Sequence, residues 1–323
     1  MFSLSERCRR RFILGKTAIL VFLLAPLLAP SISLATLQDK EKDKKKQEEI
    51  NRKDDGKVPT EKELEKSRKQ QEKAGEAKPN QAEAIVEIAI IAYFGYSGRK
   101  QIETVRGATE EEGTIRLATD QGDITGNYRV RTMKKEKSWQ DLMRVDLELT
   151  PPEAAQRQGS PTINYVIAFN GATVWSAQNG QYVTPRPEAE AAFRAQLSRE
   201  YMSLLRYKED GSKLEYVGQE TVVGVPTHVI DMTNPNGEKT RYWVSSRTYR
   251  IVHCEYQLQL VDGQPPIKYR ISYFYTPFKV VQNTLLPVRR VMEQDGKFVQ
   301  EIVINNAVYS AKLDPEIFQH LQQ

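Results

Sequence analysis

The stretch from Leu214 to Val244 limits most strongly what this chain can fold into, because it alternates β-prone runs with tight turns. Strands are predicted at Leu214–Val217, Val225–Thr233 and Thr240–Val244, where the apolar residues are mostly β-branched or aromatic. The turn Asn-Pro-Asn-Gly at 234–237 combines a fixed proline φ with residues that tolerate positive φ. Isolated hairpins are marginal in water, so the rest of the chain must supply further strands and a cover for one face.

Further strands are expected on both sides of this meander, because similar runs are bounded by Asn-Gly, Asp-Gly and Pro-Pro turns. They are expected at Thr114–Ala118, Gly126–Met133, Met143–Thr150, Ile163–Phe169, Ala172–Ser176, Gln181–Thr184, Arg250–Leu260, Ile267–Tyr275, Leu285–Met292 and Phe298–Asn305. The chain therefore carries about eleven strands or a few more.

Two helices are predicted within this β-rich body. Gln81–Tyr96 is apolar nearly all round, which is typical of a buried helix. Pro187–Tyr207 places its apolar residues largely on one face, with a break near Ser198 as one option. Because strands and helices do not alternate as in βαβ units, the sheet is expected to be antiparallel. The fold class is mainly β, of the α+β type, built as a barrel, half barrel or curved sheet.

The N-terminus has the pattern of an export signal. Arg9, Arg10, Arg11 and Lys16 precede a short apolar run, and the small residues around Ala35 suit a signal peptidase. Residues 1–35 are therefore expected to be a signal peptide cleaved after Ala35, and an uncleaved membrane anchor is the less favoured alternative.

Residues 36–80 are predicted to be a charged, disordered linker, because they hold too few large apolar residues to bury a core. Residues 81–323 form the folded domain. The net charge of +5 lies almost wholly before residue 81, and the body is close to neutral. A neutral body lacks the basic surface that binds nucleic acid, so no nucleic-acid partner is expected.

No catalytic or metal-binding constellation is found. The chain has 3 histidines, His228, His253 and His320, without metal-ligand spacing. His253 and Cys254 are neighbours on a predicted strand, where they must point to opposite faces and cannot form a dyad. The acids at 110–112 are expected in an exposed loop. The chain is therefore predicted not to be an enzyme and to need neither cofactor nor metal.

Aromatic and aliphatic residues gather on the predicted strands and give the candidate site. Val252, Cys254, Tyr256 and Leu258 alternate onto one face of their strand. Such a face either packs as a filled core or forms an apolar wall that binds a lipid or acyl chain beneath the helices. The candidate lipid-binding residues are Trp175, Ile230, Met232, Tyr256, Leu258, Tyr273 and Tyr275.

Five segments in order resemble a known family. They are Phe169–Trp175 (FNGATVW), Leu214–Pro226, Tyr242–Tyr249 (YWVSSRTY), Leu285–Arg289 (LLPVR) and Leu313–Phe318 (LDPEIF). They are similar to motifs of the LolA-like, or outer membrane lipoprotein-sorting, proteins. Ser245 stands where that family's pattern has an aspartate, and the charged linker is not part of the pattern.

This resemblance implies an incomplete antiparallel β-barrel around an apolar cavity, with helices covering the concave face. It implies a periplasmic protein that binds acyl chains, lipids or lipoproteins and contacts membranes peripherally or transiently. The alternative is a non-enzymatic envelope sensor or protein-interaction module with a filled core, whose partners are envelope proteins. An open cavity favours the first function, and packing of Ile230 and Met232 against Leu204 and Leu205 makes the meander a scaffold only.

Overall fold

The computed structural model describes residues 80–105, 107–120, 122–150, 162–260, 263–273 and 278–320. The predicted signal peptide, nearly all of the predicted linker and Tyr275 lie outside these residues. The strands are β1 (Ala108–Thr119), β2 (Gly122–Met133), β3 (Leu142–Thr150), β4 (Ile163–Phe169), β5 (Val174–Gln178), β6 (Gln181–Val183), β7 (Lys213–Val222), β8 (Val225–Thr233), β9 (Lys239–Ser245), β10 (Ile251–Leu258), β11 (Ile267–Ser272), β12 (Phe278–Val281), β13 (Thr284–Pro287), β14 (Arg289–Gln294) and β15 (Lys297–Tyr309).

Short helices complete the described chain. The α-helices are α3 (Gln81–Phe94), α4 (Arg99–Val105), α6 (Pro187–Arg199), α7 (Tyr201–Leu205) and α8 (Tyr207–Asp210), and the 3₁₀ turns are η2 (Gly95–Ser97), η3 (Ser138–Gln140) and η4 (Pro315–Phe318). Among these helices, none combines the length and apolar character needed to cross a membrane.

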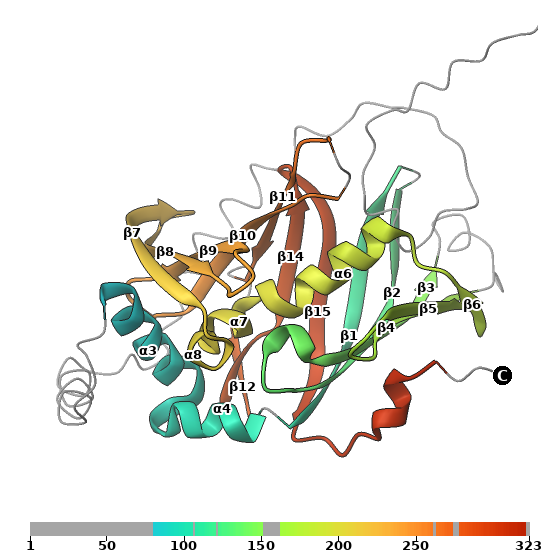
Figure 1. Cartoon of the computed structure of the whole chain (residues 1–323), viewed down its shortest axis with the longest axis horizontal. Helices are drawn as coiled ribbons and strands as arrows, with labels where there is room; N and C mark the ends of the chain where they lie inside the picture. The colour runs from blue at the N-terminus through green and yellow to red at the C-terminus, as the bar shows by residue number, and fades with distance from the viewer. Residues whose placement is uncertain are drawn as a thin grey trace, which may run out of the picture.

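Thirteen strands form one curved sheet in the order β6-β5-β4-β3-β2-β1-β15-β14-β11-β10-β9-β8-β7 (Figure 1). Neighbouring strands pair antiparallel, while β12 and β13 form a separate hairpin. Within the described residues β6 and β7 are the two edges, so the barrel is open. The expected fold class, an incomplete antiparallel barrel with helices on its concave side, is confirmed, with 13 strands in place of about eleven.

Three segments differ from the prediction. The expected strand Leu285–Met292 is two strands, because Thr284–Pro287 pairs with β12 while Arg289–Gln294 joins the main sheet. A short helix, α4, occupies Arg99–Val105, where no helix was predicted. The acids at 110–112 lie inside β1 and not in a loop.

Helices pack on the concave side and divide its core in two. Helix α3 begins at Asn80, whose side chain accepts a hydrogen bond from the Glu83 backbone N–H at 2.9 Å. One cluster of buried residues joins α3 and α7 to the half of the sheet that contains β8, β10 and β11. The other joins α6 to β1–β5. Helix α6 crosses the concave face between these halves (Figure 1).

The convex face carries a row of charges across five strands. Asp231, Arg241, Glu255, Arg270 and Glu293 lie directly opposite one another in register, with alternating sign. Arg241 donates to Asp231 at 2.6 Å, and Arg270 Nε donates to Glu255 at 2.6 Å. Opposite charges facing across strands stabilise a sheet by a few tenths of a kcal/mol each, so this row fixes the register and keeps the outer face polar.

A small apolar cluster on the same outer face contains a buried histidine. His253 packs against Trp243 with ring centroids 4.1 Å apart and the rings tilted by 42°. Among the described residues neither of its ring nitrogens has a hydrogen-bond partner. Burial lowers the pKa of His253 to about 4, and the positive charges of Arg270 and Lys268 act in the same direction against Glu255. The folded protein therefore holds this imidazole neutral.

Stability is expected to fall as the pH drops below about 6.5. In this range His253 takes up a proton in the unfolded protein, whereas its pKa of about 4 keeps it neutral in the folded protein. Between about pH 7.5 and about pH 5 this one group should cost about 2 kcal/mol of unfolding free energy. Urea unfolding of the parent and of His253→Phe at both pH values measures it. If the variant loses as much stability as the parent over this interval, another group is responsible.

Candidate functional site

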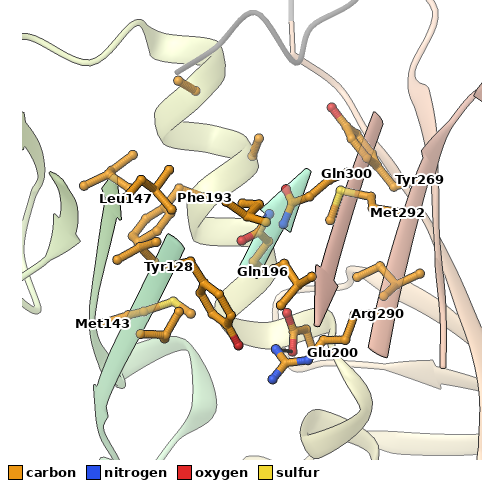
Figure 2. Close-up of a pocket in the computed structure, with 18 of the residues that line it drawn as sticks. Tyr128, Met143, Leu147, Phe193, Gln196, Glu200, Tyr269, Arg290, Met292 and Gln300 are labelled. Atoms are coloured by element: carbon orange, nitrogen blue, oxygen red, sulfur yellow. Dashed lines mark hydrogen bonds and ion pairs between the residues drawn. The ribbon is translucent and has the colours of Figure 1, made fainter. Parts of the chain in front are cut away.

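An apolar pocket of about 110 Å³ lies between α6 and the concave face of the sheet and is partly open (Figure 2). Strands β1–β4, β10, β11, β14 and β15 and helix α6 contribute to its wall. The lining residues are Ile115, Tyr128, Val130, Met143, Val145, Leu147, Ile167, Ala189, Ala192, Phe193, Gln196, Glu200, Tyr256, Tyr269, Ile271, Arg290, Met292, Gln300 and Ile302.

The pocket is located where the two core clusters meet without filling the space. Tyr256, Ile271 and Met292 belong to the cluster beneath α3 and α7. Ile115 and Phe193 belong to the cluster beneath α6. The small side chains of Ala189 and Ala192 on α6 face this seam and leave it partly empty.

The register of the sheet places charged groups at one end of this apolar space. Arg290 lies opposite Ile302, which lies opposite Ile115, so the arginine shares the pocket face. Glu111 lies opposite Val130, which also lines the pocket. Directly opposite residues share a face in an antiparallel sheet, and both charged side chains therefore point inward.

A helix break supplies the third charged group, Glu200. This residue separates α6 from α7 with extended φ and ψ. The break frees backbone groups, and buried tyrosines bind two of them: the Tyr201 N–H donates to Tyr273 Oη at 3.2 Å, and Tyr242 Oη donates to the Glu200 carbonyl at 3.2 Å. The break, expected near Ser198, is thus fixed two residues later with the Glu200 side chain directed inward.

Arg290 joins the two acids. Its Nη1 lies 3.2 Å from Glu200 Oε2, and its Nη2 pairs with Glu111. Burial raises the pKa of Glu200, and Glu111 raises it further, while Arg290 opposes both. The two carboxylates outweigh burial and raise the pKa of Arg290 well above its usual value. The guanidinium therefore stays charged and holds two inward acids.

A second, polar cavity of about 80 Å³ adjoins the first and shares Val130, Met143, Gln196, Glu200 and Arg290 with it. Its remaining lining residues are Thr109, Glu111, Thr132, Lys134, Ser138, Asp141, Leu197, Tyr201, Met202, Ser203 and Arg206. Arg206 Nη1 pairs with Asp141 at 2.6 Å, and both side chains are almost fully buried. Burial lowers the pKa of Lys134, although Asp141, 3.6 Å away, opposes this. The apolar space thus ends in a polar one.

The predicted site residues are distributed over three places. Tyr256 lines the apolar pocket. Ile230, Met232 and Tyr273 lie in the filled core that contains Leu204 and Leu205, and Leu258 packs against that core. In this part of the sheet the meander is a scaffold.

Trp175 lies apart from the pocket. Its strand neighbour Val174 faces the concave core, so Trp175 points to the other side, where its Nε1 donates to the Phe318 carbonyl at 2.8 Å. The C-terminal turn η4 covers it there. Tyr275 lies outside the described residues.

The residues that sequence reasoning missed are mainly Glu111, Glu200 and Arg290. The expectation that the acids at 110–112 are solvated is wrong for Glu111, because β1 continues through them and pairs with β2 and β15. One signal was available: Glu111, Gly113, Ile115 and Leu117 alternate along one face.

His253 and Cys254 point to opposite faces, as expected from strand alternation. His253 packs on Trp243 outside, while Cys254 is buried inside and its thiol donates to the Arg199 carbonyl at 3.3 Å. Over the described ranges, no group of three His, Cys, Asp or Glu side chains is arranged to hold a metal ion.

No protein-family model and no curated protein sequence matches this chain. Solved structures do resemble it. A LolA superfamily protein from Nitrosomonas europaea is 14% identical, with a TM-score of 0.45 over 74% of this chain and 97% of that one. A DUF1329 family protein from Desulfovibrio piger is 12% identical, with a TM-score of 0.47 over 75% and 98%.

A domain from Vibrio parahaemolyticus, described as an outer membrane lipoprotein-sorting protein, is 12% identical, with a TM-score of 0.42 over 66% and 89%. These names include the family that the sequence motifs resemble. The similarity is one of fold, and the function proposed below rests on the geometry of the pocket.

Proposed function

We propose that this protein binds an apolar chain, such as the acyl chain of a lipid or lipoprotein, in the pocket beneath α6. The observation that supports it is the incompletely filled seam between two core clusters, which is walled by aliphatic and aromatic side chains. An apolar space with a few convergent polar groups is the usual form of a small-molecule site. The role is that of a carrier, without catalysis.

The size of the pocket bears on the ligand. Small-molecule pockets commonly measure about 300–1,000 Å³, and an engineered apolar cavity of about 150 Å³ holds one benzene. A space of about 110 Å³ therefore accommodates a short segment of one chain in this conformation. A longer chain extends through the open side or moves α6 outward.

Filling the pocket from α6 should abolish this binding. Ala192 lines the pocket, so Ala192→Phe places a ring where the chain would lie. Affinity for a fluorescent fatty acid should fall by at least about tenfold, which corresponds to about 1.4 kcal/mol. Fluorescence titration of the purified full chain measures it. The neighbouring Ala191 lines neither cavity, so Ala191→Phe is the matched control and should bind like the parent.

Lipid extraction and native mass spectrometry provide a second readout. A protein that carries no lipid and takes up no fatty acid contradicts the proposal. Equal affinities of Ala192→Phe and Ala191→Phe would place the bound chain elsewhere on the molecule. Circular dichroism of both variants confirms that each is folded, because overpacking costs about 1–3 kcal/mol.

The proposal also includes export to the periplasm and a role in lipoprotein sorting. The pattern in residues 1–35 supports delivery to the periplasm, where such a carrier would meet membranes transiently. N-terminal sequencing of the protein from a bacterial periplasm tests this, with Thr36 expected as the first residue.

A second candidate is a sensor or protein-interaction module. It is favoured by the filled half of the concave face, where Ile230 and Met232 pack in one cluster with Leu204 and Leu205. In-cell crosslinking distinguishes the two: a stable protein partner in the absence of any lipid favours this candidate.

A further inference from the structure

Three buried hydrogen-bond donors, on residues that line the two cavities, have no partner among the described residues. They are Tyr128 Oη, Arg290 Nε and Arg206 Nε. Tyr128 is 3% exposed and Arg206 is 1% exposed. Leaving a buried donor unsatisfied costs about 1–3 kcal/mol, so such groups in a native structure call for an acceptor from outside the chain.

The three residues that carry these donors line the two adjoining cavities. Tyr128 lines the apolar cavity, Arg206 the polar one, and Arg290 both. Figure 2 shows the Tyr128 hydroxyl directed toward the end of the pocket that holds Arg290 and Glu200. A ligand whose chain fills the apolar cavity would therefore place its head group near hydrogen-bond donors that lack an acceptor.

The charges around this head position are balanced. The polar cavity is lined by three acids, Glu111, Asp141 and Glu200, and three bases, Lys134, Arg206 and Arg290. Each base already contacts at least one of the acids. A head with a net charge would leave one charge uncompensated in a buried site, which is costly.

We infer that the ligand is a single-chain amphiphile with an uncharged head rich in acceptor oxygens, such as an acyl ester of a polyol. Its carbonyl and hydroxyl oxygens accept from Tyr128 Oη and the two arginine Nε groups, and its chain lies against Ile115 and Phe193. This inference rests on the proposed function, since it assigns the head of a ligand whose chain that function places.

Three probes with the same short chain test the head. Isothermal titration of the full chain uses monooctanoylglycerol, octanoate and octyltrimethylammonium, each below its micelle concentration. The neutral ester should bind at least about tenfold more tightly than either ion, because only its head satisfies the donors without adding charge. Equal or tighter binding of either ion overturns the inference.

Tyr128→Phe tests the contact itself. The variant keeps the ring and removes one unpartnered hydroxyl, so its stability should not fall. Its affinity for monooctanoylglycerol should drop about fivefold, with no change for octyltrimethylammonium. Tyr309→Phe is the control, because the Tyr309 hydroxyl is also buried and without a partner among the described residues, yet Tyr309 lines neither cavity.

The outcomes separate this inference from the proposed function. If all three probes bind equally, or Tyr128→Phe changes nothing, the head assignment fails while chain binding stands. If none of the probes binds and fatty acids are not taken up, the proposed function fails with it. An equal loss in Tyr309→Phe would also overturn the assignment, because the effect would then not come from the cavity.

Discussion

Replacing Arg290 by methionine is expected to destabilise the protein by about 3 kcal/mol, the low end of the cost of breaking a buried ion pair. The substitution removes a cation that contacts both Glu111 and Glu200, whose carboxylates face the interior. The side chains of Arg290, Glu111 and Glu200 are only 11%, 13% and 22% exposed, so removing the arginine leaves two largely buried charges uncompensated. Urea unfolding near neutral pH measures the difference from the parent.

Arg289→Met is the matched control for this change. Arg289 is the neighbour on the same strand, faces the outer side and pairs with Glu301. Part-exposed pairs contribute about 0–1 kcal/mol, so this variant should lose far less stability.

The pH dependence gives a second check. Burial raises the pKa of Glu200, and without Arg290 the charge that opposes this rise is gone. Protonation of Glu200 then stabilises the fold, and this stabilisation is present at low pH and lost as the pH rises through the raised pKa of Glu200. The difference in unfolding free energy between Arg290→Met and the parent should therefore become smaller as the pH falls toward about 5. If Arg290→Met loses no more unfolding free energy than Arg289→Met, or if its loss does not change with pH, Arg290 does not hold the two acids as described.

Gly113→Ala is expected to cost at least about 3 kcal/mol. A Cβ at this position would lie 1.9 Å from the Val303 carbonyl oxygen and 2.8 Å from a ring carbon of Tyr128. The nearest atom belongs to the backbone of β15, so the two strands would have to separate at a place where their register already shifts. Overpacking that moves backbone exceeds the usual cost of about 1–3 kcal/mol.

Binding should fall along with stability in this variant, because the second contact is with Tyr128 on the pocket wall. Thermal unfolding and fatty-acid titration measure the two effects. Thr114→Ala is the control, since this neighbouring side chain is exposed and should change stability by less than about 1 kcal/mol. A Gly113→Ala variant as stable as Thr114→Ala would mean that β1 and β15 approach less closely than described.

Local chemistry accounts for the parts of the fold that could be predicted from the sequence. The strands Ile163–Phe169 and Val225–Thr233 were predicted to the residue, because each ends at a residue pair that only a turn accommodates well. The strand expected at Leu285–Met292 was misjudged because its apolar run continues across Pro287. Nothing local to that run shows that its two halves pair with different strands.

The site was less predictable because it depends on contacts between distant segments. Glu111, Glu200 and Arg290 come from two strands and a helix break, and their order in the sequence does not indicate that they meet. Alternation identified an apolar face around Tyr256, and that residue does line the pocket. The same alternation holds for Ile230 and Met232, where the space is filled, because periodicity reports which side chains face inward and not how much room remains between them.

Photocrosslinking with a fatty acid that carries a diazirine in its chain would locate the bound chain within the protein. If the chain binds beneath α6, peptide mapping should find the label on α6 near Phe193 and on β3 between Met143 and Leu147, because both segments line the pocket. The labelling should disappear in Ala192→Phe and persist in Ala191→Phe. Label confined to the exposed edge residues Tyr182 and Val183, or equal labelling of both variants, would contradict a binding site between α6 and the sheet.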